Sequence, residues 1–155
     1  MFDNILNDLT GTFSTVPVDV ATLRLVVAVI LGGAIGYERE LRSKAAGLRT
    51  HILIALAACL FVIISQSIAT LPFGADAELR VDPLRLIEAV TAGVAFLAAG
   101  AIFTQGAKVH NLTTGAGMWL AGAIGLACGA GQVPLAVIAT VICVAVLWAL
   151  RQLET

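Results

Sequence analysis

Charged side chains are scarce in this sequence: only 12% of its 155 residues are Asp, Glu, Lys or Arg, whereas 59% are hydrophobic. Soluble domains carry about 25% charged residues, so this chain has about half of what a water-facing surface requires. The scarcity excludes an ordinary soluble domain and indicates that lipid surrounds most of the chain. The net charge of −1 gives no basic footprint, so we expect no nucleic-acid partner.

Motifs for catalysis and for metal binding are also missing. Cys59, Cys128 and Cys143 lie singly within apolar runs, without the paired spacing that metal and redox sites use, so we interpret them as small hydrophobic residues. The sequence has no nucleophile elbow, no phosphate-binding glycine loop and no helical pair of histidines. We therefore expect neither an enzyme nor a resident cofactor.

Long hydrophobic runs, by contrast, fill the chain. A helix needs about 20 mostly apolar residues to cross a bilayer core about 30 Å thick. Runs of this kind occupy residues 20–37, 52–71, 86–103, 112–130 and 133–150. The sequence therefore predicts an all-α, polytopic transmembrane helix bundle of about five spans in residues 20–151, after a short extracytoplasmic segment in residues 1–19.

The basic residues predict how the bundle is oriented. With five spans, one side receives six of them: Arg39, Arg42, Lys44, Arg49, Lys108 and Arg151. The other side receives Arg80, Arg85 and Arg24, the last of which is close enough to the interface to snorkel. Because short cytoplasmic loops carry the excess of Lys and Arg, we expect the N-terminus outside and the C-terminus in the cytoplasm.

Small residues predict which helices pack most tightly, because helices in lipid associate through close packing. The first, third and fourth spans are rich in them, so we expect these three to form the tight core and the second and fifth to face lipid more. The glycines assigned to helix packing are Gly32, Gly36, Gly93, Gly100, Gly125 and Gly129. A helix broken at a binding site is the alternative, strongest around Gly115 and Gly117.

The first of three polar clusters links the first two spans and comprises Glu38, Arg39, Arg42, Gly47, Arg49 and Thr50, with His51 following. Glu38 and Arg42 are an i,i+4 pair if the helix continues. Glu38 and Arg49 could also pair across the loop and pin the two spans together, because polar groups at that depth need partners. The alternative is a solvated loop that only sets the topology.

The second cluster is acidic and precedes the third span, with Asp76, Glu78, Asp82 and Glu88. Magnesium keeps several waters and binds through one or two carboxylates, so Asp82 and Glu88 predict a weak magnesium site. The alternative is a solvated loop in which Asp82 caps the helix before Pro83 and pairs with Arg85. Glu88 is the better functional candidate, because an intramembrane carboxylate marks a site by default.

The third cluster begins the fourth span with Thr113 and Thr114. Their hydroxyl groups can satisfy free backbone donors or form hydrogen bonds across helices. Trp119 lies too deep for an interfacial belt, so we expect it to pack against a neighbouring helix.

These clusters, in this order, resemble the MgtC/SapB family of bacterial inner-membrane proteins. The resemblance rests on Gly-Tyr-Glu-Arg-Glu at 36–40, Ala-Gly-Leu-Arg-Thr-His-Ile-Leu at 46–53, Asp-Pro-Leu-Arg at 82–85 and Leu-Thr-Thr at 112–114. The chain departs from the family pattern at Ala95 and Ala98, where glycine is usual, and at Asn111 and Gly115. The family's namesake carries a cytoplasmic ACT-like C-terminal domain, so we expect this chain to be the membrane module alone.

The resemblance implies growth under low magnesium and, in pathogens, survival inside macrophages. We expect a multi-pass inner-membrane protein of magnesium or ion homeostasis that acts without catalysis, through helix contacts with a membrane-protein partner or in a homo-oligomer. The alternative is a transporter or channel for magnesium or another cation, with a route near Glu88, Thr113 and Thr114.

Overall fold

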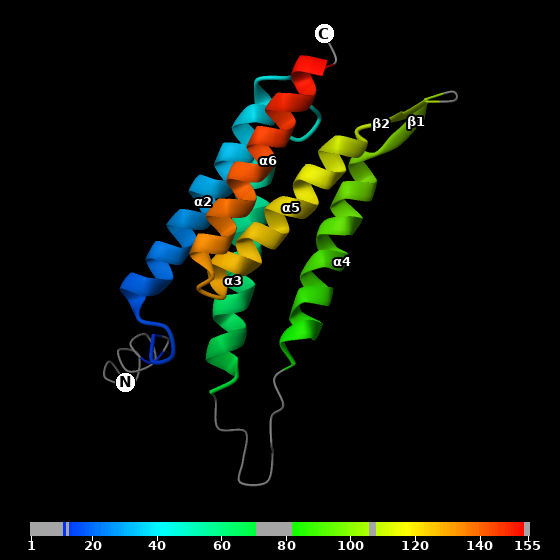
Figure 1. The fold of residues 1–155 in the computed structure, drawn as a ribbon. Helices are drawn as coiled ribbons and strands as arrows, with labels where there is room; N and C mark the ends of the chain where they lie inside the picture. Colours follow the sequence, from blue (N-terminus) through cyan, green and yellow to red (C-terminus); the bar gives the residue numbers. More distant parts are fainter. Residues whose placement is uncertain (1–10, 12, 71–81, 106–107, 154–155) are drawn as a thin grey trace.

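The computed structural model describes residues 11, 13–70, 82–105 and 108–153. Its elements are α2 (Val18–Glu40), α3 (Leu48–Ile68), α4 (Pro83–Ala101), β1 (Phe103–Gln105), β2 (Lys108–His110), α5 (Leu112–Gly129) and α6 (Val133–Leu153) (Figure 1). All five of these helices are long and apolar enough to cross a membrane. The prediction of five spans is confirmed, with boundaries shifted by about one helical turn or less.

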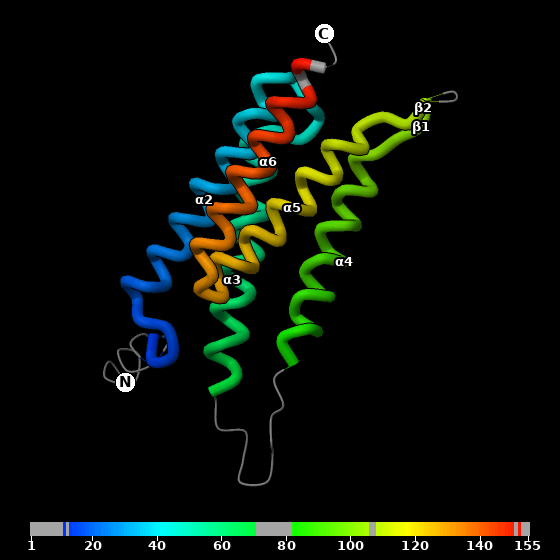
Figure 2. The backbone as a smooth tube through the Cα atoms, viewed as in Figure 1, coloured from blue at the N-terminus to red at the C-terminus, as the bar shows by residue number. Residues whose placement is uncertain are grey.

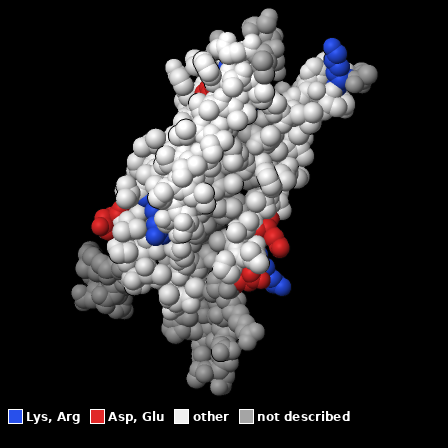
Figure 3. Space-filling model, viewed as in Figure 1, with Lys and Arg blue, Asp and Glu red and all other residues white. Residues whose placement is uncertain are grey.

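The helices alternate in direction along the chain (Figure 2). The last turn of α2, the first turns of α3 and α5, the hairpin and the C-terminal end of α6 therefore share one end of the bundle, which we call the Glu38 end. The first turn of α4 lies toward the opposite end, which we call the Asp82 end. Between the charged groups near the two ends, the surface shows a broad region without Lys, Arg, Asp or Glu (Figure 3). This pattern fits a bilayer core around the middle of the helices.

The centre of the bundle is α3, which packs between α2 and α5. A Cβ added at Gly32 of α2 would lie 2.7 Å from the Cβ of Ala55, and one added at Gly129 of α5 would lie 2.6 Å from the backbone oxygen of Cys59. Two glycine faces thus let the backbones of α2 and α5 approach α3 closely. Gly36 and Gly125 make similar contacts, so four of the six glycines assigned to packing lie where two helices approach closely.

The prediction that the third span belongs to the tight core is wrong. Helix α4 packs mainly on α5, through Val90, Val94 and Ala98, and only lightly on α3. A Cβ added at Gly93 or Gly100 would meet nothing within 4 Å. The spacing of the small residues indicates a contact face but not which molecule covers it. The second span is central instead of lipid-facing, because Ala55, Ala58 and Cys59 are small enough to receive both glycine faces.

A short β-hairpin between α4 and α5 was not predicted from the sequence. Strands β1 and β2 pair antiparallel, with Phe103 opposite His110 and their rings stacked at 5.1 Å. Asn111 then adopts a left-handed conformation, with φ of 65°, and its Nδ2 donates a hydrogen bond to the carbonyl oxygen of Ala101 at 2.9 Å. Asn111 thereby closes the end of α4 and begins α5, which continues unbroken through Gly115 and Gly117.

Candidate functional site

The Glu38 end buries an arginine between three helices. Arg39 is only 3% exposed, although it lies in the last turn of α2. It follows Ala28, Gly32 and Ile35 on the buried stripe of that helix, so helical periodicity directs its side chain inward. A buried guanidinium requires polar partners, because burial removes the water that would otherwise solvate it.

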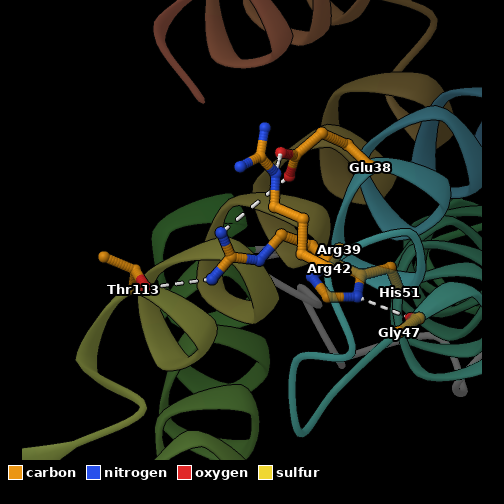
Figure 4. A network of polar contacts seen from close by, with 6 residues as sticks. All are labelled: Glu38, Arg39, Arg42, Gly47, His51 and Thr113. Atoms are coloured by element: carbon orange, nitrogen blue, oxygen red, sulfur yellow. Dashed lines mark hydrogen bonds and ion pairs between the residues drawn. The ribbon is translucent and has the colours of Figure 1, made fainter. Parts of the chain in front are cut away.

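The partners of Arg39 come from α2 and α5 (Figure 4). Its Nη2 donates a hydrogen bond to Oγ1 of Thr113 at 2.9 Å, and its Nη1 lies 3.9 Å from Oε2 of Glu38. Thr113 therefore forms a cross-helix hydrogen bond, one of the two roles predicted for it. Arg39 connects the end of the first span to the beginning of the fourth.

Glu38 forms ion pairs with two arginines, of which Arg42 was predicted and Arg39 was not. It forms an ion pair with the Nε of Arg42, the i,i+4 neighbour, and a longer one with Arg39. The predicted pair between Glu38 and Arg49 is wrong: among the described residues, Glu38 pairs only with Arg42 and Arg39. Arg49 is exposed in the first turn of α3, because that position lies on the face of α3 opposite the buried His51 side.

Glu40 ties α2 to α3 at the short link between them. Its Oε2 accepts a hydrogen bond from the backbone N of Leu48 at 2.9 Å, which supplies the α3 N-terminus with an acceptor that Gly47 cannot give. A Cβ added at Gly47 would collide with this carboxylate. Gly47 thus belongs to the site by leaving room for Glu40. Its neighbour Thr50 is half-buried in the first turn of α3.

His51 is the site residue that sequence reasoning passed over. Its side chain is fully buried, and Nδ1 lies 2.8 Å from the carbonyl oxygen of Gly47. Because a carbonyl only accepts, Nδ1 carries the proton and the Nε2 of a neutral ring presents a lone pair. A Cβ added at Gly117 of α5 would lie 3.1 Å from Nε2, so the absence of a side chain there makes room for the ring. No signal in the sequence connects His51 with Gly117, because the two residues lie 66 positions apart.

Four buried polar atoms at this end have no hydrogen-bond partner among the described residues: Oε2 of Glu38, Nε of Arg39, Nε2 of His51 and Oγ1 of Thr114. Most buried polar groups in proteins are satisfied, so such a concentration is unusual. The four atoms belong to α2, α3 and α5. The Glu38 end therefore has unused hydrogen-bonding capacity in its interior.

The acidic cluster at the Asp82 end follows the alternative interpretation where the structure describes it. Asp82 accepts a hydrogen bond from the backbone N of Leu84 at 3.0 Å, and Pro83 begins α4. Asp82 also lies 3.9 Å from Nε of Arg85, and both side chains are exposed. Glu88 is exposed on α4. Asp76 and Glu78 lie outside the described residues, and within those described no group of three His, Cys, Asp or Glu side chains gathers to hold a metal ion.

Two residues lie differently from what the sequence suggested. Trp119 is 53% exposed, so it does not pack into a neighbouring helix of the same chain. Arg24 is half-buried, and its Nη1 donates to the carbonyl oxygen of Gly129 at 2.8 Å and to Oε1 of Gln66 at 3.3 Å. Arg24 thus reaches the carboxyl end of α5, where the helix dipole favours a cation.

The predicted cation route does not form a single site within one chain. Glu88 lies in the second turn of α4 and Thr113 in the first turn of α5, so they occupy opposite ends of two antiparallel helices. Between them, Val94 packs against Gly122, and Ile102 and Ala98 pack against Gly115. Apolar contacts fill the boundary between α4 and α5.

Comparison with known proteins agrees with the motifs and the five helices. The model of the MgtC family matches residues 25–155. The chain belongs to the MgtC family. This MgtC-family chain is 39% identical over 131 residues to the protein named "Putative magnesium transporter YhiD" of Escherichia coli (strain K12), with 84% of the chain and 60% of that relative covered.

Further relatives are similar at the same level. The protein named MgtC of Brucella abortus (strain 2308) is 40% identical over 129 residues, which cover 83% of this chain and 50% of the relative. An uncharacterized protein of Synechocystis sp. (strain PCC 6803) is 39% identical over 133 residues, covering 86% of this chain and 53% of its own length. The chain spans 50–60% of the length of these relatives.

No solved structure matches. Membership of the family and the five apolar helices make this a multi-pass membrane protein.

Proposed function

We propose that this chain serves magnesium homeostasis in the bacterial inner membrane, with its N-terminus outside and the Glu38 end toward the cytoplasm. The name of the Escherichia coli relative supports the connection with magnesium. The six-to-three distribution of Lys and Arg supports the orientation. Tags at the two ends of the chain, assayed for protease access in intact spheroplasts, test it: both ends on one face would contradict it.

The mode of action that we propose is contact between membrane helices, without catalysis. One observation carries it: a Cβ added at Gly93 or Gly100 of α4 would meet nothing within 4 Å, so this face has room for another backbone. On the same helix Phe96 is 79% exposed. Glycines at a helix surface in lipid are useful where another backbone approaches, because lipid tails gain nothing from them. The partner is a second copy or another membrane protein.

Cross-linking of α4 in native membranes tests this contact. Phe96→Cys places a thiol on the open face, and Ile138→Cys places one on α6, where the native side chain is 56% exposed. The unmodified chain, in which Cys59 and Cys128 are buried and Cys143 is half-buried, serves as the blank. We expect a disulfide-linked adduct from Phe96→Cys and none from Ile138→Cys. Equal yields from the two positions would refute a specific interface on α4.

Transport by the chain itself is the second candidate, and the unpaired polar atoms of His51 and Thr114 favour it. Apolar side chains close the boundary between α4 and α5, so a cation route would not follow that boundary within one chain. Purified protein in liposomes containing a magnesium-sensitive dye separates the two candidates. Magnesium entry that Thr114→Val abolishes would establish transport. Absence of entry, together with the α4 adduct, would support the contact mechanism.

A further inference from the structure

A groove runs between α2 and α6 toward the Glu38 end. Its apolar part has a volume of about 570 Å³ and is lined by Leu31 and Val141 among others. A second hollow of about 360 Å³ adjoins it. The two share the lining residues Ala34, Glu38, Val144 and Trp148. Together they form one amphiphilic groove, because the second hollow also includes Tyr37 and Arg42.

The polar end of this groove carries Arg42, whose guanidinium group is only partly engaged in hydrogen bonds. Arg42 is 26% exposed and engages Glu38 through Nε alone (Figure 4). Its two Nη groups form no hydrogen bond with any described residue, and they point away from Glu38 in Figure 4. One carboxylate, Glu38, faces the two guanidinium groups of Arg39 and Arg42, so the local charge is positive. A guanidinium fork with free Nη groups matches the oxygens of a phosphate.

The aromatic side chains at this level indicate the membrane interface. Tyr37 and Trp148 are both 58% exposed, and both line the polar hollow. Tyr and Trp are enriched where headgroups meet hydrocarbon, because one side of the ring is apolar and the other carries a polar group. The groove therefore changes from apolar to cationic near the depth at which a phospholipid changes from acyl chain to phosphate.

We propose that this groove binds one glycerophospholipid, with an acyl chain between α2 and α6 and its phosphate on Arg42. The volume lies within the range of about 300–1,000 Å³ that is usual for small-molecule sites. The charge complementarity between the free Nη groups and a phosphodiester selects this occupant over a neutral lipid. Because Arg42 is paired with Glu38, and Glu38 with Arg39, the bound phosphate joins the network that reaches Thr113 on α5.

The tryptophan content of the chain provides a direct measurement. The chain has two tryptophans, so Trp119→Phe leaves Trp148 in the groove as the single reporter. Bromine on an acyl chain quenches indole fluorescence on contact. The full-length protein is reconstituted in phosphatidylcholine bilayers, and brominated phosphatidylglycerol or brominated diacylglycerol is added at equal mole fraction. We expect the phosphate-bearing lipid to quench Trp148 at about tenfold lower mole fraction than the diacylglycerol.

Two substitutions and two matched controls test the contacts separately. Arg42→Gln removes the phosphate contact and should eliminate the preference for the phosphate-bearing lipid. Ala34→Phe fills the groove and should weaken quenching by both lipids. Lys44→Gln removes a charge from the same link at an exposed position, and Ala149→Phe adds the same bulk on an exposed face of α6 outside the groove. Both controls should behave like the parent protein, and helical content checks the fold of every variant.

Several outcomes would overturn the proposal. Equal quenching by the two lipids, or an unchanged preference in Arg42→Gln, would show that no phosphate is recognised. Reversal of quenching by millimolar inorganic phosphate would assign Arg42 to free phosphate instead of lipid. Trp148 protected from every brominated lipid would mean that a second copy covers the groove.

Discussion

Two glycine-to-alanine substitutions give a matched test of how the helices pack. A Cβ added at Gly125 of α5 would overlap the backbone oxygen of Ala55 and lie 2.8 Å from the Cβ of Ala58. The obstacle is mainly backbone, so α3 and α5 would have to separate. A Cβ added at Gly93 of α4 would meet nothing within 4 Å. The same chemical change is thus made once inside a contact and once on an open face.

The expected magnitude follows from two opposing terms. Alanine in a helix interior is favoured over glycine by about 0.5–1 kcal/mol, and this gain applies to both positions. Overpacking at a tight contact costs about 1–3 kcal/mol and applies only to Gly125. The free energies of unfolding of the two variants should therefore differ by about 1–3 kcal/mol, with Gly125→Ala the less stable.

Reversible unfolding in mixed micelles, with increasing dodecyl sulfate and helicity as the readout, measures this difference. Equal stabilities would refute the close approach of α3 and α5. A second readout connects the result to the proposed interface. If α4 meets another molecule through Gly93, then Gly93→Ala should lower the yield of the Phe96→Cys adduct while the isolated chain stays as stable as the parent.

Three further predictions concern the polar contacts. In a double-mutant cycle with Arg39→Gln and Thr113→Val, the coupling free energy should be about 1 kcal/mol, because the donor is charged and buried. Hydrogen bonds between membrane helices average about 0.6 kcal/mol and reach about 1.7 kcal/mol. A coupling free energy near zero would count against the 2.9 Å hydrogen bond. Exchanging the charges of Glu38 and Arg42 should restore most of the stability that either single charge reversal removes. The same exchange of Glu38 and Arg49 should restore none. Recovery of stability in the Glu38 and Arg49 exchange would contradict the ion pairs described here. Arg24→Leu should lower the free energy of unfolding by about 1–3 kcal/mol, because the carbonyl oxygen of Gly129 and Oε1 of Gln66 lose a charged donor. A control substitution at the exposed Leu23 should change the free energy of unfolding by less than about 0.5 kcal/mol.

Much of the fold could be predicted from the sequence, because helix length in a bilayer is set by a single physical requirement. Each span needs enough apolar residues to cross the hydrocarbon, and that requirement identified all five helices. Local signals were also sufficient where both partners are close in sequence. The Asp82 cap with Pro83 and the Glu38–Arg42 pair depend only on helical spacing, and both are confirmed.

Contacts between distant segments could not be predicted in the same way. Gly32 and Gly93 both have the spacing of glycines that mark a helix contact. Only Gly32 approaches another helix of the chain closely, whereas a Cβ added at Gly93 would meet nothing within 4 Å. The additional pair of Glu38 with Arg49 was wrong because the loop spacing allows Arg49 to approach, while the rotation of α3 turns this side chain outward. His51 was overlooked because its importance depends on Gly117, 66 positions away in another span. The hairpin has strands of three residues each, too short for a recognisable pattern.

The contact of Arg24 with Gly129 has a consequence for the order of assembly. The two residues are 105 positions apart, and a chain grows at about 5–20 residues per second. Arg24 is therefore synthesised about 5–20 seconds before its carbonyl partner. During that interval, its position near the start of the helix lets the guanidinium reach water at the membrane surface. The Asp82 end of the bundle can therefore close only after α5 has been synthesised.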